Sequence, residues 1–167
     1  ALHTLGFRGE ALPSIAAVSH VTILTRTREE TVGTQMRMEG RTRVAREQRA
    51  APAGTILSVE ALFFNVPARR KFLRTTATEN GAIAEIVSTY ALAYPDHRFS
   101  LSLDGRQVLQ TNGSGKLGDA IVAVYGVEVV RQMIDLPPVE DETNGIRLDG
   151  YIGGPALSRP NRKFITL

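Results

Sequence analysis

Residues 4–19 read TLGFRGEALPSIAAVS, and in them two glycines, Gly6 and Gly9, stand directly before an apolar pattern of helical spacing. The apolar positions of that pattern are Leu12, Ile15, Ala16 and Val18. Pro13 lies near its start, where a missing backbone N–H costs little. The spacing predicts a short helix from Gly9 to about Ser19.

The start of this predicted helix has features that are typical of an anion-binding site. Glycine in the first turn lets free N–H groups approach an anion closely, and the helix dipole adds partial positive charge. Arg8 lies between the glycines, and Glu10 suits the dipole without any ligand. Spacing alone leaves two interpretations open: a phosphate-binding helix start, or an ordinary turn with a solvated Arg8.

Composition indicates a globular protein with a core. The chain has 167 residues, 43% of them hydrophobic, and a mean hydropathy of −0.08, which is neither a disordered nor a membrane composition. The length suits one ordinary domain or two small ones. The chain starts without Met and ends within a strand-like pattern, so we expect it to be an internal piece of a longer protein.

Residue usage excludes several kinds of site. The absence of Cys excludes disulfides, thiolate metal sites and cysteine catalysis, and the three His are scattered singly, which argues against a His-based metal site. The net charge is +3, and seventeen of the twenty basic residues are Arg, whose planar fork pairs well with phosphate. Codon bias in a GC-rich genome is the alternative explanation of the Arg excess.

The first half of the chain alternates as a sheet does. The strands that we expect are 20–26, 34–39, 41–47 and 56–64, with the second and third forming a hairpin around Gly40. Pro67 then fits the first turn of a helix at 68–73, with Asn65 in its cap region.

The second half begins with a polar boundary at 75–79, followed by an amphipathic helix. Its apolar stripe is Ile83, Ile86, Val87, Tyr90, Ala91 and Tyr94. We expect Ile83, Tyr90 and Tyr94 to pack into a core. The remaining predicted elements are a hairpin turning at Asp104-Gly105, a helix at 116–125 ended by Gly126, an acidic turn at 139–145, and strands at 146–152 and 163–167.

Three blocks of the chain resemble one family, in that family's order. TLGFRGEALPSIAAVS at 4–19 resembles the lid motif of the MutL family of DNA mismatch repair proteins, which are GHKL (Bergerat-fold) ATPases. GTILSVEALFFNVPARRKFLR at 54–74 resembles its second strong block, and GYIGGPALSRPNRKFITL at 150–167 is similar to the start of the next. The resemblance implies an α+β fold: residues 1–74 as the C-terminal portion of a GHKL ATPase α/β sandwich, and 75–167 as the truncated N-terminal portion of a transducer domain with a β-α sandwich.

The resemblance also implies a nucleotide site. In the family, the lid motif contacts the triphosphate through backbone amides, and the residues that would surround the β and γ phosphates are Gly6, Phe7, Arg8, Gly9, Glu10, Ala11 and Leu12. Thr55 would lie near the adenine end, where a hydroxyl can both donate and accept a hydrogen bond; without a ligand it is a Thr that opens a strand. ATP and Mg²⁺ are the implied cofactors.

By the same resemblance, the family's general-base Glu, its Mg-binding Asn and its adenine motif would precede Ala1. Its γ-phosphate Lys would follow Leu167. Glu10 belongs to the lid motif and is not assigned as the base. Because phosphoryl transfer rests on positioning, metal and charge stabilisation, we expect no catalytic residue in this chain and no ATP hydrolysis by it alone.

A basic cluster follows Pro67 and is expected to face solvent on one helix, with Lys71 and Arg74 on the same side. Such a cluster neutralises phosphates without reading sequence. The predicted DNA-binding residues are Lys71, Arg74, Arg70 and, in a later loop, Arg162. The alternative is that Arg69 and Arg70 pair with carboxylates across the domain junction and the others are solvated.

The function implied is that of an ATP-driven clamp in DNA mismatch repair. The implied partners are double- and single-stranded DNA bound without sequence preference, a mismatch-recognition protein, a downstream nuclease or helicase, and a second copy of the parent protein. The implied location is the cytoplasm, at the nucleoid. The alternative is that this piece acts only as a non-enzymatic scaffold that binds DNA and partners.

Overall fold

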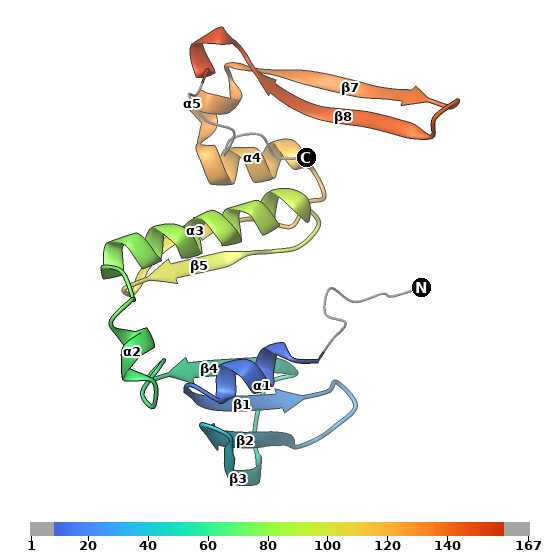
Figure 1. Cartoon of the computed structure of the whole chain (residues 1–167). Helices are drawn as coiled ribbons and strands as arrows, with labels where there is room; N and C mark the ends of the chain where they lie inside the picture. Colours follow the sequence, from blue (N-terminus) through green and yellow to red (C-terminus); the bar gives the residue numbers. More distant parts are fainter. Residues whose placement is uncertain (1–8, 159–167) are drawn as a thin grey trace. The chain divides into compact units, whose positions relative to one another are not determined.

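The computed structural model describes residues 9–158, which divide into two compact units between Leu73 and Arg74 (Figure 1). Each unit contains helices and strands, so the α+β class predicted from the sequence is confirmed. Several predictions fall outside the described residues: those on Gly6, Phe7, Arg8, Arg162 and the strand expected at 163–167. No helix among residues 9–158 is both long and apolar enough to cross a membrane.

The first unit is built on a four-stranded antiparallel sheet. Its strands are β1 (His20–Arg26), β2 (Gly33–Glu39), β3 (Thr42–Arg49) and β4 (Gly54–Glu60), in the order β3-β2-β1-β4. Helix α1 (Ala11–Ala16) precedes the sheet and helix α2 (Pro67–Arg70) follows it. Among the described residues, strands β3 and β4 are therefore the two edges of the sheet.

Period-two alternation gives β1, β2 and β4 one apolar and one polar face, whereas β3 places Arg43 and Arg46 on the face of Met38 and Met36. By register, the apolar face carries Val21, Ile23, Met36, Met38, Leu57 and Val59, and the polar face carries His20, Thr22, Arg37, Glu39, Ser58 and Glu60. Val21 of β1 and Ala16 of α1 are each only 2% exposed. The core of the unit thus lies where α1 covers the apolar face beside β1.

The elements predicted for the first unit are present, but several bounds differ: β3 spans 42–49 instead of 41–47, and α2 spans 67–70 instead of 68–73. Strand β4 ends at Glu60 rather than Phe64, because Ala61 and Phe63 take left-handed φ values of 51° and 61°. Helix α1 begins at Ala11 rather than Gly9, since Gly9 has φ +64° and cannot be part of a right-handed helix.

The second unit combines helices with two separate hairpins. Its elements are α3 (Thr76–Ala93), β5 (Ser100–Leu103), β6 (Arg106–Gln110), α4 (Leu117–Tyr125), α5 (Val127–Val130), β7 (Met133–Asp141), β8 (Ile146–Gly153) and a short 3-10 turn, η1 (Pro155–Leu157). Strands β5 and β6 pair antiparallel, as do β7 and β8. The buried apolar residues of this unit are Ala91, Leu109, Ala120 and Ile121, which come from α3, β6 and α4.

Helix α3 corrects two predictions. It begins at Thr76, so the polar stretch at 75–79 is the first turn of a helix and not a boundary segment; the Thr75 Oγ1 accepts the Thr78 N–H at 3.3 Å and caps it. Ile83 is 44% exposed and Tyr90 47% exposed, so the prediction that both pack into a core is wrong. The helix buries the small Ala91 instead, which is fully covered.

The turn signals of the second unit are more reliable than its strand signals. Asp104 and Gly105 have φ values of 50° and 76°, which two-residue hairpin turns require, and Gly126 ends α4 with φ +86°. Strand β7 was not predicted, and the acidic turn expected at 139–145 begins only at Glu142, because β7 extends to Asp141. Pro137 and Pro138 fall where the β7–β8 register shifts, between Leu136 and Val139, and so interrupt no regular pairing.

Candidate functional site

The described part of the lid segment (residues 6–12) turns into α1 at an exposed position. At Gly9, φ is +64°, and a β carbon would meet no atom within 4 Å. Glu10 is the last residue before the helix, and its side chain makes no capping hydrogen bond. The first helical bond runs from the Ser14 N–H to the Glu10 carbonyl at 3.0 Å.

The backbone N–H groups before that bond are the part of this segment that can bind an anion. The first N–H groups of a helix have no partner inside it, and α1 has no acidic side chain in its first turn to compete for them. The residues that carry these groups, Glu10, Ala11 and Leu12, are exposed, as is Gly9 before them. An anion can therefore reach the turn, as the sequence prediction requires.

Thr55 lies at the start of β4, on the sheet face that α1 covers. It pairs with Thr25 of β1, and the two hydroxyl oxygens are 2.9 Å apart. A hydroxyl in one such contact keeps capacity for a further hydrogen bond. Thr55 is exposed, so it remains accessible to a ligand. Among residues 9–158, no hydrogen bond joins it to the lid segment.

The β4–α2 turn (residues 61–65) ties the end of α1 to the segment that follows the sheet. The Phe63 N–H donates to the Val18 carbonyl at 2.6 Å, and the Asn65 Nδ2 donates to the Ala17 carbonyl at 2.9 Å. Phe63 is held at positive φ, which costs of order 1–3 kcal/mol for a residue other than Gly. These bonds compensate that strain. No signal in the sequence marks this turn, because positive φ is ordinarily a property of Gly.

The basic segment (Arg69, Arg70, Lys71 and Arg74) is not one helix. Helix α2 ends at Arg70 and Lys71 is its C-cap, so the prediction that Lys71 and Arg74 share a helix face is wrong. The Arg74 N–H donates to Glu79 Oε1 at 3.0 Å, just before the cap of α3. The chain therefore begins a second helix here instead of extending the first.

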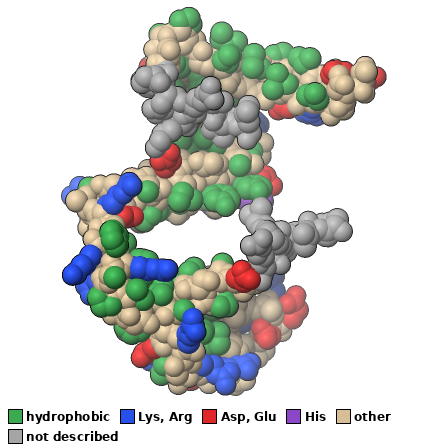
Figure 2. Space-filling model, in the orientation of Figure 1, with side chains coloured by type: hydrophobic (Ala, Val, Ile, Leu, Met, Phe, Trp, Pro, Cys, Tyr) green, Lys and Arg blue, Asp and Glu red, His purple; other side chains and the backbone are tan. Residues whose placement is uncertain are grey.

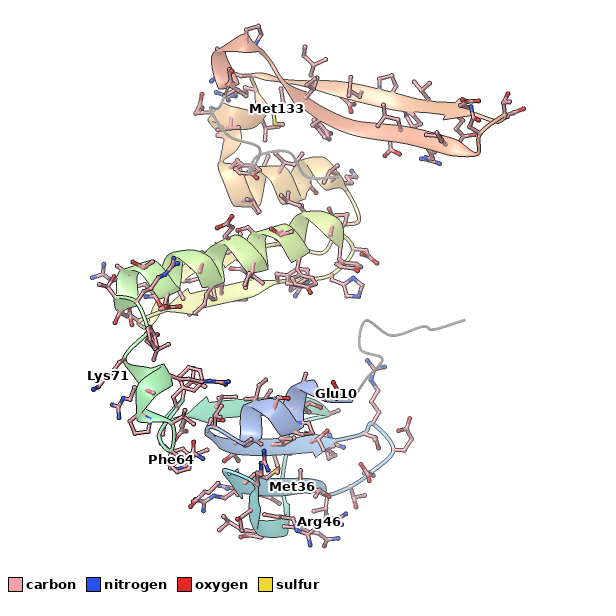
Figure 3. All side chains as sticks on the ribbon, in the orientation of Figure 1. Glu10, Met36, Arg46, Phe64, Lys71 and Met133 are labelled. Atoms are coloured by element: carbon pink, nitrogen blue, oxygen red, sulfur yellow. The ribbon has the colours of Figure 1, made fainter. Side chains whose placement is uncertain are left out.

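The four cationic side chains of the basic segment are exposed. None of these side chains has an ion-pair partner among the described residues of the unit to which it belongs. Lys71 projects outward from α2 (Figure 3). Asn65, which we expected near the cap of α2, bonds α1 instead, and Val66 occupies the cap position. The segment therefore presents guanidinium and ammonium groups that are free to contact phosphate.

The second unit contains an open cleft of about 440 Å³ between the start of α4 and the β7–β8 hairpin. None of the predicted nucleotide residues lines it, and its ionisable lining consists of Lys116, Asp119, Asp135, Asp149 and Tyr151. Hydrogen bonds from Ser114 and then Asn112 hold the pKa of Asp119 below its ordinary value of 3.8. The three carboxylates disfavour a phosphate ligand, so the cleft does not compete with the lid segment as a nucleotide site.

Metal-binding capacity is a separate question from anion binding. Residues 9–158 contain no group of three or more His, Cys, Asp or Glu side chains that could hold a metal ion. No side chain in that range is therefore assigned to Mg²⁺.

Curated relatives match almost the whole chain. It is 48% identical over 163 residues to the DNA mismatch repair protein MutL of Desulforudis audaxviator, covering 98% of this chain and 28% of that protein. It is 46% identical over 165 residues to MutL of Listeria innocua, covering 99% of this chain and 27% of that protein. The chain thus spans about a quarter of the length of these relatives. No family model matches it.

Solved structures share the fold as well. The Aquifex aeolicus MutL ATPase domain complexed with ADP aligns with a TM-score of 0.77 at 31% identity, covering 86% of this chain and 56% of that one. Another crystal structure of the Aquifex aeolicus MutL ATPase domain aligns with a TM-score of 0.68 at 27% identity, covering 94% and 59%. The sequence identity across nearly the whole chain and the common fold together show that this chain belongs to the MutL family of GHKL ATPases.

Proposed function

We propose that this chain supplies the phosphate-lid side of the ATP site in a DNA mismatch repair protein of MutL type. The observation that carries the proposal is the turn at Gly9, where a left-handed glycine leads into α1 and the exposed amides there have no hydrogen-bond partner among residues 9–158. The Aquifex aeolicus domain with the same fold is complexed with ADP, which supports a nucleotide as the anion. The proposed contacts are Gly6, Phe7, Arg8, Gly9, Glu10, Ala11 and Leu12 on the phosphates and Thr55 toward the adenine.

The residues of this chain bind and orient nucleotide in the proposed mechanism. Backbone N–H groups at the start of α1 point at the terminal phosphates and stabilise their charge, as helix N-termini do. The β4–α2 turn fastens the end of α1, so the helix presents the amides at its start from a fixed position. Mg²⁺, held by residues of the longer protein, would neutralise phosphate charge during transfer.

Replacing Gly9 with Ala in the longer protein is expected to weaken ATP binding about tenfold. Ala adopts φ near +60° only at a cost of order 1–3 kcal/mol, and 1.4 kcal/mol corresponds to a factor of ten in affinity. The turn would therefore lose the conformation that directs the backbone amides toward the phosphates. Titration of the protein with ATP, alongside its rate of ATP hydrolysis, measures the effect.

Gly145→Ala is the matched control for this experiment. Gly145 has φ +63°, close to the +64° of Gly9, and its β carbon also meets nothing within 4 Å. It lies in the β7–β8 turn, so the variant carries the same strain away from the lid segment. Equal ATP affinity in the two variants would show that Gly9 has no special part in binding nucleotide.

We also propose that the basic segment contacts DNA through its phosphates, in double and single strands and without sequence preference. The residues assigned to this contact are Lys71, Arg74 and Arg70, with Arg162 as a second location. Their support is the exposure and lack of ion pairs described above for Arg70, Lys71 and Arg74. Side chains of this kind release counterions when they meet a phosphate, so binding would weaken as salt rises.

Lys71→Glu combined with Arg74→Glu is expected to weaken binding to duplex DNA. The magnitude of the slope of log K against log salt should fall by about 1.8, because each lost phosphate contact contributes about 0.9. Fluorescence anisotropy of a labelled duplex at several salt concentrations measures both quantities. The control is Arg98→Glu with Arg106→Glu, the same change of charge at two exposed positions in the second unit. A slope equal to that of the control would reject the assignment.

The remaining assignments follow from the longer protein to which this chain belongs. We assign residues 1–74 to the C-terminal portion of the ATPase domain and 75–167 to the N-terminal portion of the transducer domain. The parent would be a clamp that dimerises when it binds ATP and works with a mismatch-recognition protein and a downstream nuclease or helicase. Its place of action would be the cytoplasm, at the nucleoid.

A further inference from the structure

Positive charge in this chain is concentrated in the first unit, and within it on the β2–β3 hairpin. Up to Leu73 the chain has eleven Lys and Arg against six Asp and Glu, whereas from Arg74 onward it has nine against eleven. The hairpin alone, residues 33–49, holds five Arg and two Glu. Figure 2 shows many of the Lys and Arg side chains over the part of the molecule that holds β1–β4.

Three of the five hairpin arginines have no partner among the described residues. Arg37 pairs with Glu39 at 3.8 Å, and the Arg49 guanidinium donates to Gln35 Oε1 at 2.6 Å. The other three, here called the arginine edge, are Arg41, Arg43 and Arg46. They are exposed and make no ion pair or side-chain hydrogen bond within residues 9–158.

A β-bulge places two of these arginines on the same face of the sheet. Residues three apart in a regular strand point to opposite faces. Arg43 nevertheless lies opposite Met38 and Arg46 opposite Met36, because the register shifts and Val44 is the extra residue. Met36 and Met38 are two residues apart, so the two arginines stand about 6.7 Å apart along the strand. Figure 3 labels Arg46 and Met36 on these strands.

The two edges of this sheet are built differently. Edge strand β4 has no Lys or Arg and exposes Ile56, Leu57 and Val59, while edge strand β3 exposes one apolar side chain, Val44, among its arginines. Charged side chains on an edge also prevent unwanted strand pairing, and that role requires no alignment on one face. A bulge is itself a feature that protects sheet edges; here it also places Arg43 and Arg46 on one face.

We propose that Arg41, Arg43 and Arg46 bind the sugar–phosphate backbone of double-stranded nucleic acid as a surface separate from the basic segment. Guanidinium forks match phosphate oxygens in pairs, and a row of them suits a row of phosphates. An acidic protein partner fits less well, because protein interfaces centre on aromatic anchors and residues 33–49 contain no Phe, Tyr or Trp. The contact carries no base readout, so binding is independent of sequence. The proposal goes beyond the function assigned above, which puts DNA on the basic segment.

The test is Arg43→Glu with Arg46→Glu in this chain. We expect the slope of log K against log salt for a duplex of about 20 base pairs to fall by about 1.8 between 50 and 200 mM salt, at about 0.9 for each lost phosphate contact. The loss should be equal for duplexes of unrelated sequence. Arg98→Glu with Arg106→Glu is the control, with the same total charge change in the other unit and an expected slope close to the wild-type value.

Further variants separate the possible reasons for a change. Arg43→Lys with Arg46→Lys should keep the slope, and Arg43→Gln with Arg46→Gln should lose it without adding negative charge. Circular dichroism and size-exclusion chromatography establish that each variant is folded and monomeric. A slope matching the control, or aggregation of the Gln variant with unchanged duplex binding, would leave edge protection as the role of these arginines and overturn the proposal.

Two more comparisons distinguish the partner and the site. Polyglutamate should compete poorly for the arginine edge; equal competition by polyglutamate and duplex would overturn nucleic acid as the partner. Combining the Arg43 and Arg46 changes with those at Lys71 and Arg74 should add their slope changes. If only the variant at Arg43 and Arg46 changes the slope, the basic segment is rejected and this proposal stands. If only the variant at Lys71 and Arg74 changes the slope, this proposal is rejected and the basic segment stands.

Discussion

Replacing Gly113 with Ala is expected to lower the free energy of unfolding of the second unit by about 2–4 kcal/mol. Gly113 has φ +66°, and a β carbon there would lie 3.1 Å from the Arg98 nitrogen and 3.2 Å from the His97 carbonyl carbon. Both are backbone atoms, so no side chain can move aside. The substitution therefore adds steric overlap to the strain of a left-handed residue.

The surroundings of Gly113 cannot readily relax. Thr111 is 3% exposed, and its hydroxyl accepts the Phe99 N–H at 2.9 Å and donates to the His97 carbonyl at 3.2 Å. The Gly115 N–H also donates to the Pro95 carbonyl at 3.0 Å. These bonds hold the loop before α4 against the segment that follows α3.

Two glycines in the same unit serve as controls for this prediction. Gly115 has φ +77° with open space around its β position, so Gly115→Ala should show the strain alone, about 1 kcal/mol. Gly81 lies inside α3 with nothing within 4 Å, so Gly81→Ala should raise stability by about 0.5–1 kcal/mol. Urea unfolding with hydrogen exchange of the β6 and α4 amides measures all three. Equal effects at positions 113 and 115 would show that the close backbone approach is absent in solution.

Replacing Val21 with Ala is expected to destabilise the first unit by about 2–3 kcal/mol, from about 0.8 kcal/mol for each buried carbon lost plus the cavity that remains. Val21 is 2% exposed and lies in β1 between Met38 and Val59, on the face that α1 covers. The loss should loosen α1, which carries the lid segment at its start. Hydrogen exchange of the α1 and β1 amides should therefore speed up together.

Val44→Ala is the matched control in the same sheet. Val44 is 51% exposed at the β3 bulge, and substitutions at such surface positions usually stay within about 0.5 kcal/mol. Denaturant unfolding of both variants decides the comparison. If the two Val→Ala changes cost the same, the apolar face beneath α1 is not the core of this unit.

Local signals in the sequence were sufficient where an element depends on its own residues. Strand β1 has the predicted bounds, the hairpin turns at Gly40 and at Asp104-Gly105 are where they were expected, and Gly126 ends α4. Alternation, turn glycines and C-cap glycines act over a few residues, so they can be read without knowing the fold.

The candidate nucleotide residues were available from the sequence for another reason. A glycine before a helix predicts an anion site only as one of two interpretations, and the resemblance over three blocks is what selected it. The structure adds that Gly9 has positive φ and that the turn is exposed. Contacts of Thr55 and of the lid segment with nucleotide remain predictions.

The sequence by itself determined the α+β class, most strands and turns, and the family. Only the tertiary structure decided that Phe63 takes a left-handed conformation, that α2 stops at Arg70, and that Arg43 and Arg46 share a face. Each of these depends on a partner outside the residue's own helix or strand: the Val18 carbonyl for Phe63, the Glu79 carboxylate in the first turn of α3 for the end of α2, and the register with β2 for the arginines. Side-chain periodicity and turn propensity describe interactions within one element, so they do not specify how that element is bonded to another.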